Sequence, residues 1–486
     1  FKKKKNYYFY KKYNKMKVEQ IYTGCLAQGA YYIESKGEVA IIDPLREVQD
    51  YINKAEADNA KIKYIFETHF HADFVSGHVT LSEKTGAPII YGPLANPSFD
   101  AIIAEDNQVF ELGDVTIKVL HTPGHTMEST CFLLIDENGK EHSLFSGDTL
   151  FLGDVGRPDL AQKAANMTQE ELAGTLFDSL RNKVMTLPNE TIVYPGHGAG
   201  SACGKNMSKE TVGTIGEQKE ENYALRADMT KEEFVKEVTD GLTPPPSYFP
   251  MNVQMNKMGY ENIEEVIKKG KTALSPSAFE AAANETEAIM LDVRHQSDFI
   301  KGHIPNSIFI GIHGGFAPWV GTLIEDLNTP IVLVAPKGRE EEAVTRLARV
   351  GYDNTKGFLE NGMDAWKMVG EKTASVLSVS TKEFAQKITN ETSILDVRKE
   401  TEYFSEHIDQ KYVSNVPLDP SIGNLNKIEN KEQYVHCAGG YRSVIAISML
   451  KAKGFHHLIN VEGGFGAIKN ESNIKTSEWV CASEMI

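Results

Sequence analysis

Three side chains of the kinds that bind metal ions, His69, His71 and Asp73, fall within five positions of the chain. They follow an apolar run, residues 62–66, whose length and branched and aromatic side chains are typical of a buried strand. The cluster therefore lies where a strand gives way to a loop, and alternate residues there can converge on one ion. A motif this short arises by chance in about 3% of chains with this histidine content. Its interpretation depends on partners further along the chain.

Three later elements supply such partners, each in a turn that contains glycine or proline. They are residues 122–126 with His125, residues 145–149 with Asp148, and residues 194–198 with His197. We expect each to follow a β-strand, and the predicted strands are residues 115–120, 131–135 and 191–193. Glycine and proline turn the chain sharply next to a ligand. The four elements together predict a metal site built at strand ends.

This ordered set resembles the metallo-β-lactamase superfamily over about residues 16–250. The resemblance implies an α/β fold, the αββα sandwich of that superfamily. Residue 74 departs from the pattern, because the dizinc hydrolases of the superfamily usually carry a histidine there and this chain has phenylalanine. Phenylalanine cannot bind a metal, so a site for two ions is compromised and a single site is left intact.

The superfamily also has a mononuclear iron branch, the persulfide dioxygenases, and the resemblance to it implies that His69, His125 and Asp148 hold one Fe(II) per chain. Two imidazoles and one carboxylate leave coordination positions open, as in non-haem Fe(II) oxygenases, so O2 and a sulfur substrate could bind side by side. Zinc with a water nucleophile is the alternative metal. Other candidates either orient these ligands or remain from a second metal site: His71, Asp73, His78 and His197.

Composition limits the classes of function. The 486 residues predict roughly three domains. The net charge of -16 disfavours a nucleic-acid partner. Five scattered cysteines without a CxxC motif predict reduced thiols in the cytoplasm. We find no apolar run long enough to span a membrane.

Two stretches suggest domain limits. Residues 1–15 are rich in Lys, Tyr and Asn and lack the apolar core of a signal peptide, so we expect a disordered basic leader outside the native chain, which would start at Met16. A basic arm that contacts an acidic partner is the alternative. The proline-rich residues 242–247 cannot continue a helix or a sheet. We therefore predict a first domain over residues 16–250 and a linker over residues 251–272.

The remainder repeats itself with a period of roughly a hundred residues. The sequence Leu-Asp-Val-Arg at residues 291–294 recurs at residues 395–398. Strands alternate with helical stretches in both copies, which predicts α/β domains with parallel sheets. Both copies resemble the rhodanese fold, over residues 273–372 and 376–474, and residues 475–486 would form a C-terminal tail.

The second copy has a cysteine, Cys437, between a strand and a predicted helix. Its loop continues with Ala438, Gly439, Gly440, Tyr441 and Arg442. A loop at a helix N-terminus directs N–H groups and the helix dipole at the sulfur and so favours a thiolate. This cysteine could accept a sulfane sulfur as a persulfide; a buried structural cysteine is the alternative. The first copy has Ala335 at the aligned position, so we expect it to be a scaffold or docking domain.

Three more residues are weaker candidates. Cys203 lies in a glycine-rich loop after His197, and the resemblance to persulfide dioxygenase–rhodanese fusions suggests sulfur relay; an inert thiol is equally compatible. For Cys25, after the first strand, we favour a packing role over one in the active site. Arg157 matches a superfamily arginine that usually pairs with a following acidic residue. A contact with a substrate carboxylate is the lesser alternative for Arg157.

The combined resemblance implies that a low-molecular-weight thiol persulfide is oxidised by O2 to sulfite, and that Cys437 transfers sulfur to sulfite to give thiosulfate, in sulfide detoxification. A glyoxalase II-like thioester hydrolase with sulfur-carrier rhodanese domains is the first alternative, and Phe74 speaks against it. A non-enzymatic sulfur carrier is the second, but a structural metal site would be closed by four ligands. The sequence does not specify the thiol. A homo-oligomer is expected, as is common for multidomain enzymes.

Overall fold

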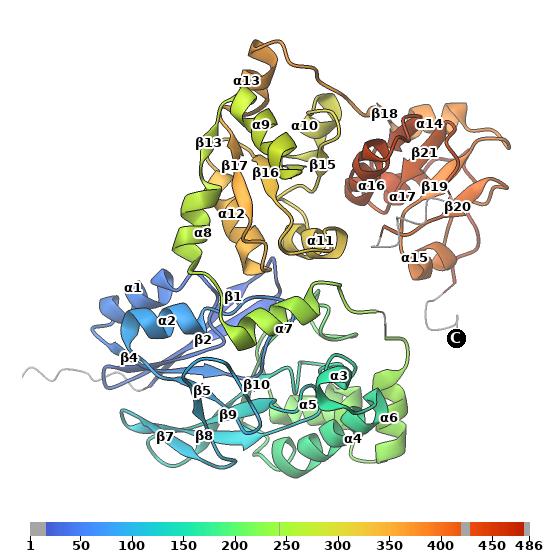
Figure 1. Ribbon diagram of the computed structural model, residues 1–486. Helices are drawn as coiled ribbons and strands as arrows, with labels where there is room; N and C mark the ends of the chain where they lie inside the picture. Colours follow the sequence, from blue (N-terminus) through green and yellow to red (C-terminus); the bar gives the residue numbers. More distant parts are fainter. Residues whose placement is uncertain (1–15, 243, 419–427, 481–486) are drawn as a thin grey trace, which may run out of the picture. The chain divides into compact units, whose positions relative to one another are not determined.

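The computed structural model describes residues 16–242, 244–418 and 428–480 (Figure 1). The first compact unit comprises the described residues up to Pro245 together with Phe249–Tyr260, and the second comprises Pro246–Tyr248 and the described residues from Glu261 onward. The predicted leader, residues 1–15, and residues 481–486 of the predicted tail lie outside the described residues. Among the described helices, none is both long and apolar enough to cross a membrane.

The first unit contains two six-stranded sheets. The first sheet has the order β1-β2-β3-β4-β5-β6. Its strands are β1 (Lys17–Thr23), β2 (Gln28–Ser35), β3 (Glu38–Ile42), β4 (Lys61–Glu67), β5 (Ile89–Tyr91) and β6 (Ile102–Ile103). β1 to β3 pair antiparallel, and β3 to β6 pair parallel. The motif with His69 and His71 therefore starts directly after the central strand β4.

The second sheet has the order β12-β11-β10-β9-β8-β7. Its strands are β7 (Val109–Leu112), β8 (Val115–His121), β9 (Thr130–Ile135), β10 (Glu141–Gly147), β11 (Ile192–Pro195) and β12 (Gly213–Thr214). The strand that precedes Asp148 is β10, so the sequence-based choice of residues 131–135 was wrong; that run is β9, the antiparallel neighbour of β10.

Helices cover the outer face of each sheet. The helices are α1 (Gln49–Ala57), α2 (His78–Thr85), α3 (Gln162–Ala165), α4 (Gln169–Ser179), α5 (Ile215–Glu221) and α6 (Lys231–Thr239), with short turns η1 (Leu180–Val184) and η2 (Tyr223–Leu225). α1 and α2 pack on the first sheet, and α4 to α6 pack on the second. Between the sheets, Phe66 packs on Phe110 and Phe132. Each such buried ring stabilises the sandwich by about 1.5–3 kcal/mol, and the predicted αββα architecture is confirmed.

The predicted linker, residues 251–272, is largely helical. It contains most of α7 (Phe249–Met258) and all of α8 (Ile263–Gly270). α7 belongs to the first unit, where the Asn256 side-chain amide donates to the carbonyl groups of His71 and Phe74, both at 2.8 Å. α8 belongs to the second unit and buries Val266 against Ala348. The first helix therefore supports the backbone of the metal motif.

The second unit contains two α/β domains with the same topology. The first comprises β13 (Ala273–Leu274), α9 (Pro276–Thr286), β14 (Ile289–Asp292), α10 (Gln296–Lys301), β15 (Ile308–Phe309), α11 (Phe316–Leu323), β16 (Ile331–Val334), α12 (Glu340–Arg349), β17 (Thr355–Leu359) and α13 (Gly362–Met368). The second comprises β18 (Leu377–Val379), α14 (Thr381–Lys387), β19 (Ile394–Asp396), α15 (Glu400–Ser405), β20 (Val413–Asn415), β21 (Gln433–His436), α16 (Tyr441–Ala452), β22 (Leu458–Val461) and α17 (Gly464–Ile468). The sheet orders β13-β17-β16-β14-β15 and β18-β22-β21-β19-β20 are equivalent, and every pairing is parallel. The predicted pair of parallel α/β domains is confirmed.

Candidate metal and sulfur-transfer sites

The metal-motif side chains meet at one edge of the sandwich. β8 and β10 both run antiparallel to β9, and β11 runs parallel to β10, so these three strands end at the same edge of their sheet. The backbone N–H of Thr130 donates to the carbonyl of Thr68 at 2.9 Å and joins β4 of the other sheet to this edge. A Cβ atom on Gly147 would lie 2.6 Å from Thr68, so glycine is needed for this close approach of the two sheets.

The first ligand group is His69, His125 and Asp148, whose ligand atoms lie within 4.8 Å of one another. The Nε2 atoms of His69 and His125 lie 3.8 Å and 3.5 Å from Asp148 Oδ2. The Nδ1 atoms are engaged elsewhere, with Thr68 Oγ1 at 3.0 Å and the Arg157 carbonyl at 2.9 Å. Both rings therefore present Nε2 to the same point. In metal-binding histidines the nitrogen that does not bind the metal usually makes a hydrogen bond that orients the ring, and Nδ1 has this role here.

A second ligand group, His71, Asp73 and His197, adjoins the first, and Cys203 joins Asp148 and His197 in an overlapping group. His197 Nε2 lies 3.4 Å from Asp73 Oδ2 and 3.6 Å from Asp148 Oδ1. Asp148 thus faces the first group with Oδ2 and the second with Oδ1, and neither oxygen has a hydrogen-bond partner among the described residues. A buried carboxylate of this kind is costly unless a cation or a donor compensates it.

Phe74 occupies the position where a further ligand of the second group would be expected. Its side chain is fully buried and packs on the His71 ring, with 4.4 Å between the ring centroids. The side chain at position 74 therefore supplies no metal ligand to the second group.

Two buried carboxyl groups that the sequence did not suggest lie behind His71. Its Nε2 is 3.2 Å from Asp43 Oδ1 and 3.5 Å from Glu67 Oε2. Burial and the neighbouring Asp43 charge raise the pKa of Glu67 well above its usual value. Asp43 directly follows β3 and Glu67 is the last residue of β4. A polar residue at the end of a buried strand was the signal that could have found them.

The pKa of a histidine is shifted in opposite directions in the two ligand groups. Burial and the positive charges of the neighbouring histidines hold the pKa of His69 well below its usual value, so the ring is neutral and can donate its lone pair to a metal. For His197, burial opposes the charge, but Asp73 and Asp148 outweigh it and raise the pKa well above the usual range. The first group is therefore prepared for a cation, whereas His197 in the second carries its own proton when no cation is bound.

His78, on α2 beside Glu67, is buried among the rings of Phe99 and Tyr260. Burial lowers its pKa to about 3. The unfolded chain binds this proton near pH 6.5, whereas the folded chain does not. The free energy of unfolding is therefore at its full value above pH 6.5 and falls as the pH is lowered below it. For the metal-free protein we expect a loss of about 2 kcal/mol from this group between pH 7 and pH 5. Hydrogen exchange of peptides from β4 should show this loss, and His78→Phe should remove it; equal pH dependence in both proteins would contradict the assignment.

Arg157 and Cys203 lie beside the metal groups. The Arg157 guanidinium forms a fork with Asp159, at 2.7 Å and 2.8 Å, and also donates to the Ala202 carbonyl at 3.2 Å. The sequence favours this pairing of Arg157 with a following acidic residue over a contact with substrate.

The Cys203 carbonyl accepts a hydrogen bond from the Arg157 backbone N–H at 3.1 Å. Burial, with the nearby Asp73 and Asp148, raises the pKa of Cys203 to about 12, which disfavours a free thiolate. Cys25 is partly exposed.

Cys437 follows β21 at the carboxyl edge of its sheet and is 1% exposed. Its Sγ accepts a hydrogen bond from the backbone N–H of Gly440 at 3.1 Å and lies 3.7 Å from Ser443 Oγ. Gly440 has a φ of 91°, a left-handed conformation that suits glycine, and this turns its N–H toward the sulfur. The carbonyls of Cys437 and Ala438 accept from Phe465 and Gly466, so α17 fixes the start of the loop.

Arg442 does not extend freely into the loop. Its guanidinium forms two hydrogen bonds with Glu402, at 2.6 Å and 2.7 Å. In the first copy, Ala335 stands where Cys437 stands in the second and has no sulfur to transfer. Both copies keep an arginine–aspartate fork on a buried aspartate, Arg294 with Asp292 and Arg398 with Asp396, which is therefore structural.

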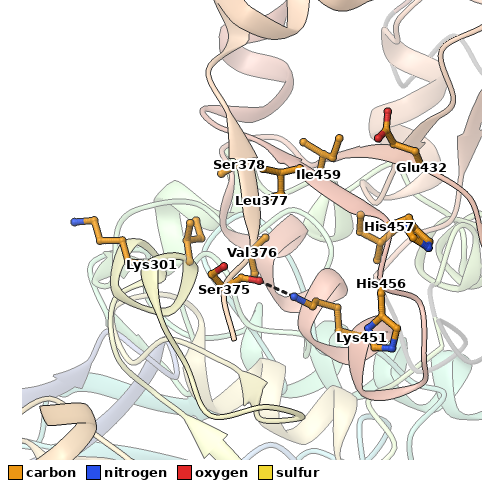
Figure 2. A pocket seen from close by; sticks show the side chains of 12 residues that line it. Lys301, Ser375, Val376, Leu377, Ser378, Glu432, Lys451, His456, His457 and Ile459 are labelled. Carbon is orange, nitrogen blue, oxygen red and sulfur yellow. Dashed lines mark hydrogen bonds between the residues drawn. The ribbon is translucent and has the colours of Figure 1, made fainter. Parts of the chain in front are cut away.

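A cavity of about 540 Å³ lies elsewhere in the second unit (Figure 2). Lys451, which lines it, donates to the Ser375 carbonyl at 2.6 Å. The lining includes His457 and Leu458 at the start of β22, whereas Cys437 follows the end of β21. Sites in parallel sheets lie outside the carboxyl ends of the strands, so this cavity is distinct from the candidate sulfur-transfer site.

Comparisons with known proteins agree with this architecture. The model of the metallo-beta-lactamase superfamily matches residues 23–197, and the rhodanese-like domain model matches residues 275–369 and 380–471. A crystal structure described as a metallo-beta-lactamase from Staphylococcus aureus is 30% identical, with a TM-score of 0.62, over 71% of this chain and 99% of that one. A hydroxyacylglutathione hydrolase of Pelagibacter ubique is 32% identical over 36% of this chain and 68% of its own length. The chain belongs to the metallo-β-lactamase superfamily.

Other curated relatives in this superfamily carry the same activity in their names. A probable hydroxyacylglutathione hydrolase of Schizosaccharomyces pombe is 34% identical over 34% of this chain and 60% of its own length. The chain spans between 48% and 68% of the length of such relatives. These matches lie in a minority of this chain, which carries two rhodanese-like domains besides its metallo-β-lactamase domain.

Proposed function

We propose that the protein is a non-haem iron persulfide dioxygenase that is coupled to rhodanese sulfurtransfer. The observation that carries the proposal is the pairing of one complete ligand group, His69, His125 and Asp148, with a phenylalanine at position 74. Two histidines and one carboxylate leave positions open for two further ligands on Fe(II). The proposal uses one iron per chain, and zinc is the alternative metal.

The buried side chains fit such an ion. Both Asp148 oxygens lack a hydrogen-bond partner within the described part of the chain, and the His69 and His125 Nε2 atoms face them. Two ligands on one ion, each at about 2.0–2.2 Å, lie roughly 3–4 Å apart, and the separations of 3.5 Å and 3.8 Å fall in this range. Bound Fe(II) would supply the O2 chemistry.

The overall oxidation balances without a further reductant. One thiol persulfide, one O2 and one water give the free thiol, sulfite and two protons; the terminal sulfur is oxidised and O2 is reduced. Thr68 and the Arg157 carbonyl hold the two imidazole rings in place. His197, between Asp73 and Asp148, would hold and release a proton beside the first ligand group. Cys203 would face the substrate sulfur, and its raised pKa favours a role as a neutral thiol over sulfur relay.

The rhodanese-like domain would then use sulfite. The Cys437 thiolate takes the terminal sulfur of a second persulfide, which releases the free thiol, and the resulting cysteine persulfide passes that sulfur to sulfite as thiosulfate. The Gly440 N–H at 3.1 Å from Sγ is placed to stabilise the anion in both states. We also propose a cytoplasmic homo-oligomer whose substrate is a low-molecular-weight thiol persulfide, in a pathway that removes sulfide.

Anaerobic purification followed by metal analysis and oxygen measurement tests the proposal. We expect about one iron per chain and oxygen uptake on addition of glutathione persulfide, with sulfite or thiosulfate as product. Two zinc ions and no oxygen uptake would overturn the proposal. Coenzyme A persulfide and bacillithiol persulfide, tested in the same way, would identify the thiol.

A thioester hydrolase of the glyoxalase II type is the second candidate, because the curated relatives are named hydroxyacylglutathione hydrolases and Asp148 faces both ligand groups. In that case Cys203 would have to replace the ligand that is missing at position 74, since it joins Asp148 and His197 in one group. Asp, His and Cys ligands suit zinc.

Phe74→His separates the two candidates. If the second group lacks only this ligand, the variant should bind about two zinc ions per chain where the parent binds one. It should also gain hydrolysis of a glutathione thioester. Phe74→Leu, which keeps the apolar contact with His71, is the matched control and should change neither quantity. A parent protein that already binds two zinc ions would favour the hydrolase.

A further inference from the structure

Tyr441, the first residue of α16, extends its side chain from the second rhodanese-like domain to the first. Its hydroxyl donates to the Gly311 carbonyl at 2.8 Å. Its ring packs edge-on against Phe309, with 5.8 Å between centroids. The ring also fills the space over Gly314, where an added Cβ would lie 2.4 Å from it. The side chain is therefore held by a hydrogen bond, an aromatic contact and a close backbone surface.

A second contact joins the same two elements. The backbone N–H of Phe309 donates to Ser448 Oγ at 3.0 Å. Tyr441 and Ser448 are seven residues apart and lie on the same face of α16. This face of the helix is thus attached at two points to β15 and the segment after it, and α16 lies against β15 (Figure 1).

The segment that receives Tyr441 is fixed within its own domain. The N–H groups of Ile310 and Ile312 donate to the carbonyls of Asp292 and Val293, both at 3.0 Å. The Gly311 carbonyl that accepts from Tyr441 also accepts from the Gly314 N–H, at 3.2 Å. Backbone hydrogen bonds therefore hold residues 309–314 in place at the carboxyl end of β14.

Tyr441 directly follows Gly440, whose backbone N–H donates a hydrogen bond to Cys437 Sγ. We propose that the first rhodanese-like domain, which lacks a cysteine, positions the Cys437 loop of the second through Tyr441. Tyr441 is a positioning residue: it sets the direction of the Gly440 N–H and of the α16 N-terminus toward the sulfur. This inference rests on the sulfurtransfer part of the proposed function and gives the first copy a role in it.

Two adjacent glycines provide a matched test in the full-length protein. Gly314→Ala would push a methyl group into the Tyr441 ring, whereas at Gly315 the nearest atom to an added Cβ is Trp319 Cδ1 at 3.5 Å, an ordinary contact. The measurement is the rate of iodoacetamide alkylation of Cys437 against pH, followed by mass spectrometry of its peptide. Alkylation needs no turnover, so the result is independent of which persulfide the enzyme uses.

For Gly314→Ala we expect alkylation at pH 7 to slow on the order of threefold to tenfold, as for one weakened hydrogen bond, with the pH midpoint moved upward. Sulfur transfer should slow to a similar degree, and oxygen uptake by the metal domain should be unchanged. Tyr441→Phe should give a smaller effect in the same direction. Equal pH midpoints in Gly314→Ala and Gly315→Ala would overturn the inference.

A double-mutant cycle separates positioning from general destabilisation. In a Tyr441→Ala background, Gly314→Ala should have no further effect on the pH midpoint, because the methyl group then meets no ring. An additive effect would show that Gly314 acts independently of Tyr441 and would contradict the proposal.

If Gly314→Ala does not fold, Tyr441→Phe decides, since it removes only the hydroxyl that reaches Gly311. A parent protein without sulfurtransferase activity but with these alkylation differences would refute the proposed function and keep the positioning role.

Discussion

Asp148→Asn is expected to lose bound iron and to reduce persulfide-dependent oxygen uptake at least about a thousandfold. Asp148 Oδ2 is the oxygen that both His69 and His125 face, at 3.8 Å and 3.5 Å. The amide keeps the size of the side chain but removes the negative charge, and its NH2 group cannot bind a cation. Metal analysis and an oxygen electrode provide the measurement, and the unfolding temperature of the metal-free protein shows whether the variant is folded.

Asp73→Asn is the informative comparison, because Asp73 belongs only to the second ligand group. With a single iron in the first group, this variant should retain about one iron per chain. With two ions that share Asp148, it should lose one of them. Loss of all metal from both variants would contradict the assignment of the two aspartates to different groups.

The sequence predicted the metal ligands better than the strands that carry them. Strand-end positions identified the wider set of candidate ligands, and the family resemblance selected His69, His125 and Asp148, which the structure brings together. The strand before Asp148 was misplaced because β10 has a polar start, Glu141-His142-Ser143, and only two central apolar residues. β10 is buried because it lies inside the sandwich. The pattern of apolar and polar residues within the strand does not predict this position.

Contacts between distant segments could not be predicted from local sequence. The partner of Tyr441 lies 130 residues earlier, in the other copy of the repeat. The helical part of the predicted linker is different, because α8 has an Asn262 N-cap and places Ile263 and Val266 on one buried face. That signal was present in the sequence, but residues 251–272 were predicted only as a linker after the proline-rich stretch.

Cys437→Ser is expected to stop sulfur transfer, at least about a thousandfold, because the nucleophile is lost. A serine hydroxyl stays protonated at neutral pH and cannot hold a sulfane sulfur. Oxygen uptake and sulfite production should continue in this variant, since they use the metal domain. The persulfide of the parent protein can be observed directly, as a Cys437 peptide heavier by one sulfur atom that loses this sulfur when sulfite is added.

The balance between the two products then shows whether the domains act in sequence. If Cys437 consumes the sulfite that the metal domain forms, the variant should accumulate sulfite in place of thiosulfate at unchanged oxygen uptake. Cys25→Ser is the matched control, because it makes the same substitution at a partly exposed cysteine, and its thiosulfate yield should equal that of the parent. An unchanged thiosulfate yield in Cys437→Ser would mean that sulfite reacts with the thiol persulfide without the rhodanese-like domain. The Gly440 N–H contact with Cys437 would then have no part in the formation of thiosulfate.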